Sequence, residues 1–127
     1  MAWRKRSHFP TIVLMLLFAG CVKEPGIGGR GEIHGRVMEI HHEEGPYYPK
    51  PEHRVYIVYG DGLIHDDDVR TGHDGRFRFA WLREGDYRIF TYSECEGDSC
   101  LVPVIRDAKV KDRMHQVDIG DLQIVNW

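Results

Sequence analysis

The strongest constraint on the fold is a tight-turn pattern followed by a strand with alternating aromatic residues. Residues 72–75 read Gly-His-Asp-Gly, and the closing Asp-Gly pair readily supplies the positive φ angles of a tight turn. After this turn Phe77, Phe79 and Trp81 recur at every second position, so the three rings are expected on one face of a strand. With residues 68–71 as the preceding strand, the pattern predicts an antiparallel hairpin with one buried face.

The chain from residue 32 onward carries further strand patterns and no helical pattern of useful length. Short runs of β-branched and aromatic residues are bounded by Gly, Pro and Asp. The expected strands cover residues 33–40, 55–59, 68–71, 76–81, 87–94, 101–105, 116–119 and 122–125. Seven or eight short strands in one domain, residues 32–127, predict an all-β sandwich or small barrel. Within that domain, Pro103 is typical of an edge strand or a bulge.

The first twenty residues have the pattern of a secretory signal peptide. Residues 3–6 are mostly basic, and residues 11–18 form an apolar stretch shorter than the ~20 residues that span a bilayer. The sequence Phe-Ala-Gly-Cys at 18–21 resembles the lipobox of bacterial lipoprotein precursors, with Phe18 where a leucine is usual. The resemblance implies cleavage before Cys21, a diacylglyceryl group on its sulfur, and a fatty acyl chain such as palmitate on its new amine.

Processing at Cys21 would leave an acidic body on a lipid anchor. The removed segment holds three of the seventeen Lys and Arg residues and none of the twenty Asp and Glu residues, so the formal charge becomes −6. This charge argues against nucleic-acid binding and against electrostatic attachment to anionic lipid. Several acyl chains would hold the protein stably, whereas one chain binds a membrane only marginally.

The sequence around the anchor predicts location and a tether. Val22, not the aspartate that resembles an inner-membrane retention signal, follows the lipidated cysteine. We therefore expect a cell-envelope protein attached to the outer membrane of a Gram-negative bacterium. Residues 21–31 are rich in glycine and carry no periodic apolar pattern, which predicts a flexible tether before the folded domain.

Cys95 and Cys100 remain as an even pair once Cys21 is lipidated. In an oxidising envelope compartment, this spacing predicts a disulfide across a turn. A redox-active pair is disfavoured, because the two-residue spacing and basic neighbours that lower a thiol pKa are both missing. The expected role is a structural staple.

Residues 71–89 resemble the carboxypeptidase regulatory-like family, whose fold is transthyretin-like. The family pattern has a threonine, Asp-Gly-x-Phe-x-Phe, a leucine, and Gly-x-Tyr before an apolar strand. These positions are filled here by Thr71, residues 74–79, Leu82 and residues 85–87. The resemblance implies a seven-stranded antiparallel β-sandwich over most of residues 32–127. It also implies a module that supports, spaces or binds, with no catalytic centre of its own.

Two pairs of aromatic residues are candidates for contact or packing. Tyr47 and Tyr48 lie in a segment with three prolines between the first two expected strands. Exposed tyrosines on a stiff loop suit a protein or glycan partner, because they offer a large contact area at low entropy cost. The alternative is that they fold back over the core. Trp81 and Trp127 are expected in the core or at its rim.

Two other functions are compatible with the residues present. A metal- or calcium-binding protein would use His65, Asp66, Asp67 and Asp68, but the segment lacks the Gly and distal Glu of a calcium loop. A solvated acidic loop needs no ion. The sequence therefore favours the solvated loop over an ion site.

A small transthyretin-like hydrolase would need a histidine and a carboxylate that meet in a pocket. No Gly-x-Ser-x-Gly motif is present. The C-terminal Ile-Val-Asn-Trp also differs from the Tyr-Arg-Gly-Ser-like tail of related hydroxyisourate enzymes. We therefore expect no catalytic residues and no cofactor. The leading expectation is a non-catalytic binding or assembly module for an envelope protein or glycan.

Overall fold

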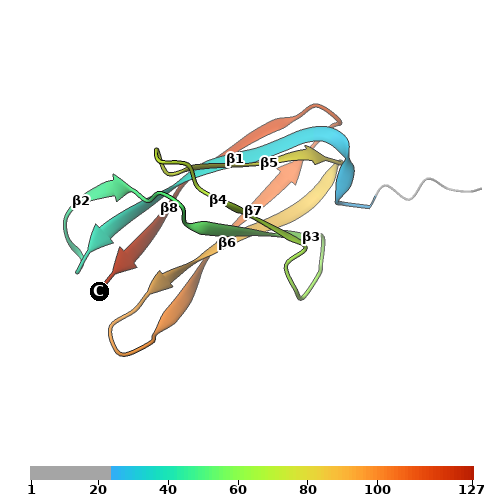
Figure 1. The fold of residues 1–127 in the computed structure, drawn as a ribbon. Coiled ribbons are helices and arrows are strands. Elements are labelled where there is room, and N and C mark those ends of the chain that lie inside the picture. The colour runs from blue at the N-terminus through green and yellow to red at the C-terminus, as the bar shows by residue number, and fades with distance from the viewer. Residues whose placement is uncertain (1–23) are drawn as a thin grey trace, which may run out of the picture.

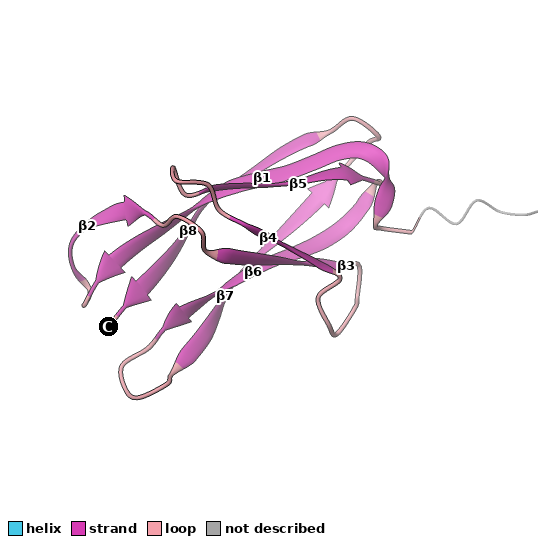
Figure 2. Ribbon diagram, viewed as in Figure 1, coloured by secondary structure: helices cyan, strands magenta, loops and turns pink. Residues whose placement is uncertain are grey.

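A computed structural model describes residues 24–127 as two four-stranded β-sheets packed face to face (Figure 1). No helix occurs among these residues (Figure 2). The predicted all-β sandwich is confirmed. The strands are β1 (Ile27–His41), β2 (Glu44–Pro49), β3 (Arg54–Tyr59), β4 (Asp67–Arg70), β5 (Arg76–Leu82), β6 (Gly85–Glu94), β7 (Leu101–Val110) and β8 (Gln116–Asn126).

The first sheet, called sheet A, is built around β1. Strand β8 pairs with β1 in parallel, from Glu32 opposite Gln116 to His41 opposite Asn126. On the opposite edge of β1, β5 and then β2 pair antiparallel with successive stretches of the strand. The sandwich was expected to be antiparallel, and the β1–β8 pair is an exception. Parallel strands need a long connection, and here strands β2 to β7 form it.

The second sheet, called sheet B, has the strand order β4-β3-β6-β7 with every pair antiparallel. The β6–β7 ladder runs without a break from Gly85 opposite Val110 to Glu94 opposite Leu101. Strand β7 is an edge strand, as Pro103 predicted, because proline lacks the N–H that a central strand would need.

The hydrophobic core lies between the sheets and takes alternate residues from both. Burial of these apolar side chains supplies the main favourable term for folding. The most deeply buried members are Ile33, Val37, Val55, Ile57, Phe77, Phe79, Leu82, Tyr87, Ile89, Val110, Leu122 and Ile124. The strand pattern around Phe77 and Phe79 predicted their inward direction correctly.

Trp81 does not share that buried face, so the prediction that it packs with the two phenylalanines is wrong. Its side chain is 62% exposed, and its φ angle is +60°, a left-handed conformation that is rare for a bulky residue. Leu82 enters the core instead and pairs with both Ile27 and Gly31 across an irregular stretch of β1. The alternation therefore shifts by one residue at Trp81.

The predicted hairpin around residues 72–75 is also wrong, although the tight turn itself is present. Gly75 has a φ of +76°, its N–H donates to the Gly72 carbonyl at 2.9 Å, and the Gly72 N–H donates to Arg76. However, β4 lies in sheet B and β5 in sheet A. Thr71 explains the separation: its N–H donates to the His53 carbonyl and its hydroxyl to the Lys50 carbonyl, which holds β4 beside β3.

Other elements also differ from expectation. The strand expected at 101–105 is β7, which continues to Val110. The strands expected at 116–119 and 122–125 form one strand, β8, with a bulge at Gly120, whose φ is +76°. Strand β1 begins at Ile27, so residues 27–31 belong to the sheet and not to a tether. An additional strand, β2, lies in the segment expected to be a loop.

The predicted signal peptide, residues 1–20, and Cys21 lie outside the described residues. Within the described part of the chain, no helix is long and apolar enough to cross a membrane.

Candidate binding surface

A cluster of aromatic rings lies on the outer face of sheet B, turned away from the core. Tyr56 on β3 stacks against Phe90 on β6, with ring centroids 4.9 Å apart and an interplanar angle of 13°. Tyr92 meets both rings edge-on at 5.8 and 5.7 Å. His65, from the β3–β4 loop, meets Tyr56 at 4.8 Å. The rings support one another, because stacked and edge-to-face pairs are the favoured aromatic geometries.

The cluster arises because the middle of β6 carries apolar or aromatic residues on both faces. Tyr87 and Ile89 point into the core, while the alternate residues Phe90 and Tyr92 point outward. Strand β7 extends this outer surface with aliphatic residues, because Ile105 lies opposite Phe90 on the neighbouring strand. We call the set Tyr56, Phe90, Tyr92, Leu101, Pro103 and Ile105 the aromatic face.

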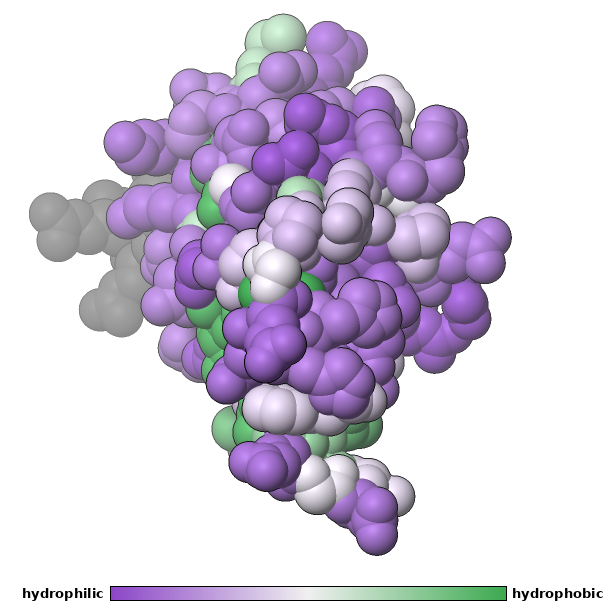
Figure 3. Space-filling model, turned by 90° about the vertical axis from the view of Figure 1, so that its left-hand side faces the viewer, coloured by the Kyte–Doolittle hydropathy of each residue, from purple (hydrophilic) through white to green (hydrophobic). Residues whose placement is uncertain are grey.

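The aromatic face is exposed to solvent. Leu101 is 60% exposed, Ile105 48% and Tyr92 39%. Figure 3 shows apolar side chains gathered near the hairpin at the bottom of the view, on a surface that is otherwise mostly hydrophilic. An exposed apolar group of this kind is typical of a contact surface. Sequence reasoning missed it, although apolar residues on both faces of the strand at 87–94 are a signal that could have revealed it.

A charged hollow of about 360 Å³ continues the outer face of sheet B toward the start of β6. Two cross-strand pairs of opposite charge contribute to its lining: Arg88 lies opposite Asp107, and Asp86 lies opposite Lys109. Apolar surface next to a few polar groups is the usual composition of a recognition surface, in which the polar groups fix orientation.

His53, which lies just before β3, contacts β6, the strand that carries Phe90 and Tyr92. Its Nε2 lies 3.1 Å from the carbonyl oxygen of Tyr92. Burial lowers the pKa of His53 by more than the hydrogen bond to the Tyr92 carbonyl raises it, so the neutral ring donates this hydrogen bond at pH 7. Lys50 is itself paired with Glu39 at 3.0 Å, and the Glu39 side chain is only 12% exposed.

Tyr47 and Tyr48 lie on β2, at the edge of sheet A, and are 39% and 58% exposed. They do not fold back over the core. Because β2 belongs to the other sheet, these tyrosines are not part of the aromatic face. They form a separate exposed pair beside the β1–β2 turn.

The residues from His65 to Asp68 are engaged in the loop's own contacts. The Asp66 carboxylate accepts a hydrogen bond from the Tyr59 N–H at 2.7 Å, and Asp68 pairs with Arg54 at 3.6 Å. The Asp67 carboxylate accepts from the Asp68 N–H. Within residues 24–127, no three His, Cys, Asp or Glu side chains are arranged to hold a metal ion. The geometry gives these carboxylates a structural use.

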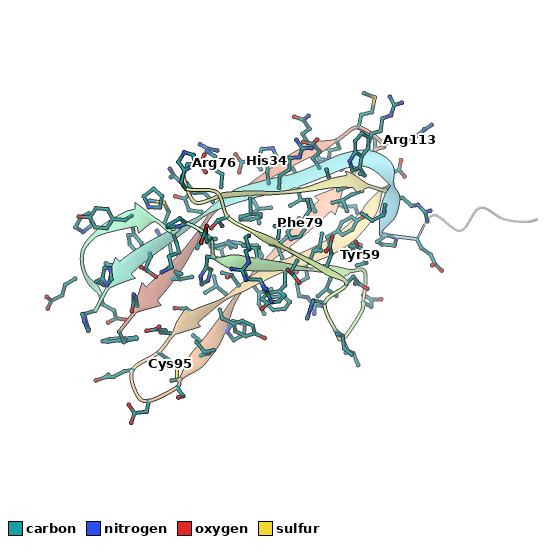
Figure 4. All side chains as sticks on the ribbon, viewed as in Figure 1. His34, Tyr59, Arg76, Phe79, Cys95 and Arg113 are labelled. Carbon is teal, nitrogen blue, oxygen red and sulfur yellow. A yellow bond between two sulfur atoms is a disulfide. The ribbon has the colours of Figure 1, made fainter. Side chains whose placement is uncertain are left out.

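The Cys95–Cys100 disulfide is confirmed. It closes the tip of the β6–β7 hairpin, where the Cys95 N–H also donates to the Cys100 carbonyl at 3.1 Å (Figure 4). The staple thus holds together the two strands that carry most of the aromatic face.

Ser93 is the buried serine of the domain, and its hydroxyl has backbone partners. It donates to the Glu94 carbonyl at 3.0 Å and accepts from the Val125 N–H at 2.8 Å. Neither partner is a base that could activate a nucleophile. This serine therefore links β6 to β8 and has the geometry of a structural residue.

No protein-family model and no curated protein matches the sequence. Three solved structures are similar in fold. A proposed carbohydrate-binding protein from Pseudomonas aeruginosa shares 13% identity, over 80% of this chain and 91% of that one, with a TM-score of 0.49. (S)-allantoin synthase shares 13% identity over 79% of this chain and 42% of its own, with a TM-score of 0.50. A minor pilin, GBS52 of Streptococcus agalactiae, shares 15% identity over 80% of this chain and 47% of its own, with a TM-score of 0.44.

At these identities, the likeness to (S)-allantoin synthase shows a shared fold and carries no activity to this chain. The described residues define the protein as a β-sandwich module with one aromatic outer face.

Proposed function

We propose that this protein is a lipid-anchored envelope protein whose β-sandwich is a non-catalytic binding or assembly module. The observation that carries the proposal is the aromatic face of sheet B, which exposes tyrosine, leucine and isoleucine side chains on a rigid sheet. Tyrosine and other aromatic residues are enriched where proteins bury surface against a partner. Covering this face would remove apolar area from water, which is the main driving force of association.

The arrangement of the rings favours a protein partner over a glycan. Tyr56 and Phe90 stack on each other, so each uses one ring face inside the cluster. What remains exposed is ring edges together with the aliphatic side chains of Leu101 and Ile105. Such a mixed apolar surface matches the core of a protein interface, where shape complementarity brings many small contacts together.

The anchor in this proposal is Cys21, acylated after cleavage of residues 1–20 and held in the outer membrane of a Gram-negative bacterium. Its support is the lipobox-like sequence and the acidic charge of the remaining chain. An acidic body gains nothing from anionic lipid, so attachment would depend on the acyl chains.

Site-specific photo-cross-linking in intact envelopes tests the proposal. A photoreactive residue replaces Tyr92 on the aromatic face, and in a matched control it replaces Gln123, which is exposed on β8 of sheet A. A third variant carries it at Tyr48, to test the exposed pair on β2. Mass spectrometry then identifies what is captured.

We expect one dominant protein partner from position 92 and none from position 123. Capture at position 48 alone would move the binding surface to β2, and no enriched partner at any position would overturn the binding proposal. A Cys21→Ser form cannot be lipidated, so it should take up no labelled fatty acid, whereas the wild type should. Equal labelling of the two forms would contradict the proposed anchor.

A further inference from the structure

One end of the sandwich is tied directly to the segment that follows Cys21. The Gly26 N–H donates to the Tyr87 hydroxyl at 2.9 Å, and the Arg83 N–H donates to the Gly26 carbonyl at 2.8 Å. The Tyr87 hydroxyl in turn donates to the Arg83 carbonyl at 2.7 Å. We call this the anchor end: the start of β1, the β3–β4 loop, the β5–β6 turn and the β7–β8 loop. It lies on the right in Figure 1, opposite the disulfide hairpin and the C-terminus.

The chain between the predicted lipid anchor and this end is short. Cys21 precedes Gly26 by five residues, and five residues span at most about 18 Å even when fully extended. Because β1 begins at Ile27, residues 27–31 add nothing to that reach. A lipid on Cys21 would therefore keep the anchor end close to the bilayer surface.

The anchor end exposes large apolar side chains from separate elements. Leu63 and Ile64, in the β3–β4 loop, are 99% and 77% exposed. Trp81 near the end of β5 is 62% exposed, Met114 in the β7–β8 loop 68%, and Ile27 at the start of β1 54%. In Figure 4, the labels of Tyr59 and Arg113 mark the lower and upper parts of this end. Several large apolar side chains exposed at one end of a domain indicate a surface that is covered in use.

The backbone of Trp81 supplies a second observation. Its left-handed φ of +60° accompanies the outward direction of the indole, and this conformation is unfavourable for a bulky residue. Backbone outliers of this kind persist where the surrounding structure enforces them, and they are enriched at functional sites. Tryptophan is also the residue type most typical of the membrane–water interface, where its apolar ring and its N–H are both accommodated.

The charges at the anchor end do not favour an anionic surface. The exposed charged residues at this end include basic Arg83, Lys111 and Arg113 and acidic Asp61, Asp66, Asp86 and Asp112. With charges of both signs present, the apolar side chains would have to provide the contact with lipid.

We propose that the anchor end of the sandwich seats on the membrane surface, with Trp81 at the level of the lipid headgroups and Leu63 and Ile64 dipping below them. The proposal rests on the lipidation of Cys21 in the proposed function. Its consequence is a fixed orientation: the disulfide hairpin and β2 point away from the membrane, and the aromatic face stands at the side of the molecule, open to a partner.

Tryptophan fluorescence tests this orientation with a built-in control. After cleavage before Cys21, Trp81 and Trp127 are the chain's only tryptophans, and Trp127 lies near the opposite end, beside His42. The lipidated mature protein, residues 21–127, is placed in zwitterionic vesicles with or without brominated acyl chains, which quench indoles by contact. Trp127→Phe reports on Trp81 alone, and Trp81→Phe reports on Trp127 alone.

We expect brominated lipid to reduce the emission of Trp81 at least about twofold, because an interfacial indole reaches the outer acyl region, and to leave Trp127 unchanged. A Leu63→Ser, Ile64→Ser double variant should remain on the vesicles and lose much of that quenching. Adding anionic lipid should change nothing, because the anchor end carries both charge signs.

The outcomes separate the two proposals. Protein that stays on the vesicles while Trp81 is not quenched, or is quenched no more than Trp127, overturns the seated orientation and leaves the lipid anchor standing. Protein that does not associate with vesicles at all overturns the anchor, and the orientation with it.

Discussion

The outer faces of the two sheets have the same strand geometry but differ in the side chains that they expose to solvent. On sheet A the outward residues of β1, β5 and β8 are mostly charged. Arg36 forms a two-bond pair with Asp121, both bonds at 2.9 Å, and Arg78 pairs with Glu32 at 3.6 Å. Figure 4 shows Arg76 and His34 on this side of the molecule. On sheet B the corresponding positions carry the stacked rings of the aromatic face.

The difference separates what folding requires from what binding requires. A β-sandwich needs one apolar face on each sheet. Sheet A has an apolar inner face and a charged outer face that contacts water. Sheet B meets this need too, through inward residues such as Ile57 and Ile89, and it also carries apolar side chains on part of its outer face. Since the core is complete without the outer rings, the aromatic face is the part of the surface that calls for a functional explanation.

The largest expected effect comes from removing a ring of the aromatic face. Phe90→Ala should lower the free energy of unfolding by about 2–3 kcal/mol, because the half-buried ring contacts both Tyr56 and Tyr92. The matched change on sheet A, Arg78→Ala, should cost less than about 0.5 kcal/mol, as is usual for an exposed residue. Urea denaturation of both variants measures the contrast. Equal losses would mean that the two faces do not differ energetically.

Opening the disulfide should have the next largest effect. A Cys95→Ser, Cys100→Ser variant should lose about 2 kcal/mol, the chain-entropy value for so short a loop. Because the disulfide joins β6 to β7, its loss should also reduce the yield of photo-cross-linking from position 92. Treating the wild type with reductant should reproduce the loss, and a variant as stable as the wild type would show that the hairpin needs no staple.

A smaller effect concerns pH and the strand that carries Tyr92. The folded-state pKa of His53 lies below its ordinary value, chiefly because of burial. The unfolded state therefore binds the proton first, and stability should fall as the pH drops below about 6.5. His53→Gln removes this titration, so the difference in unfolding free energy between pH 7 and pH 5 should shrink in the variant. An unchanged difference would show that other histidines account for it.

The smallest effect is expected from the ion pair on sheet A. The hydrogen bonds from Arg36 lower the pKa of Asp121 below the ordinary range of an aspartate. The Arg36–Asp121 pair therefore stabilises the fold at pH values above the ordinary aspartate pKa. This contribution is lost as the pH falls below about 4. Asp121→Asn should be slightly less stable than the wild type at pH 7 and equal to it at pH 2. A deficit that persists at pH 2 would show that the cost is not electrostatic.

The candidate site was less accessible to sequence reasoning than the fold. Tyr47 and Tyr48 are exposed as contact residues would be, yet their segment forms an edge strand and not a loop. The aromatic cluster joins Tyr56 to residues 34 and 36 positions later, and its rings meet only because β3 and β6 pair in one register. No local pattern contains that register, since it is fixed by how the whole core packs.

The sequence by itself determined the features that depend on neighbouring residues. The Asp-Gly turn, the inward alternation of Phe77 and Phe79, the edge position of Pro103 and the disulfide across five residues all follow from local geometry.

Tertiary structure alone decided which strands pair. Thr71 is hydrogen-bonded to Lys50 and His53, which precede β3. Strands β4 and β5 therefore lie in different sheets, although a tight turn connects them. The parallel pairing of β1 with β8 joins the two ends of the domain. Trp81 turns outward because Leu82 fills the core at the site where β1 is irregular. Each of these outcomes depends on side chains that are distant in sequence and compete for the same buried volume. Local propensities contain no information about this competition.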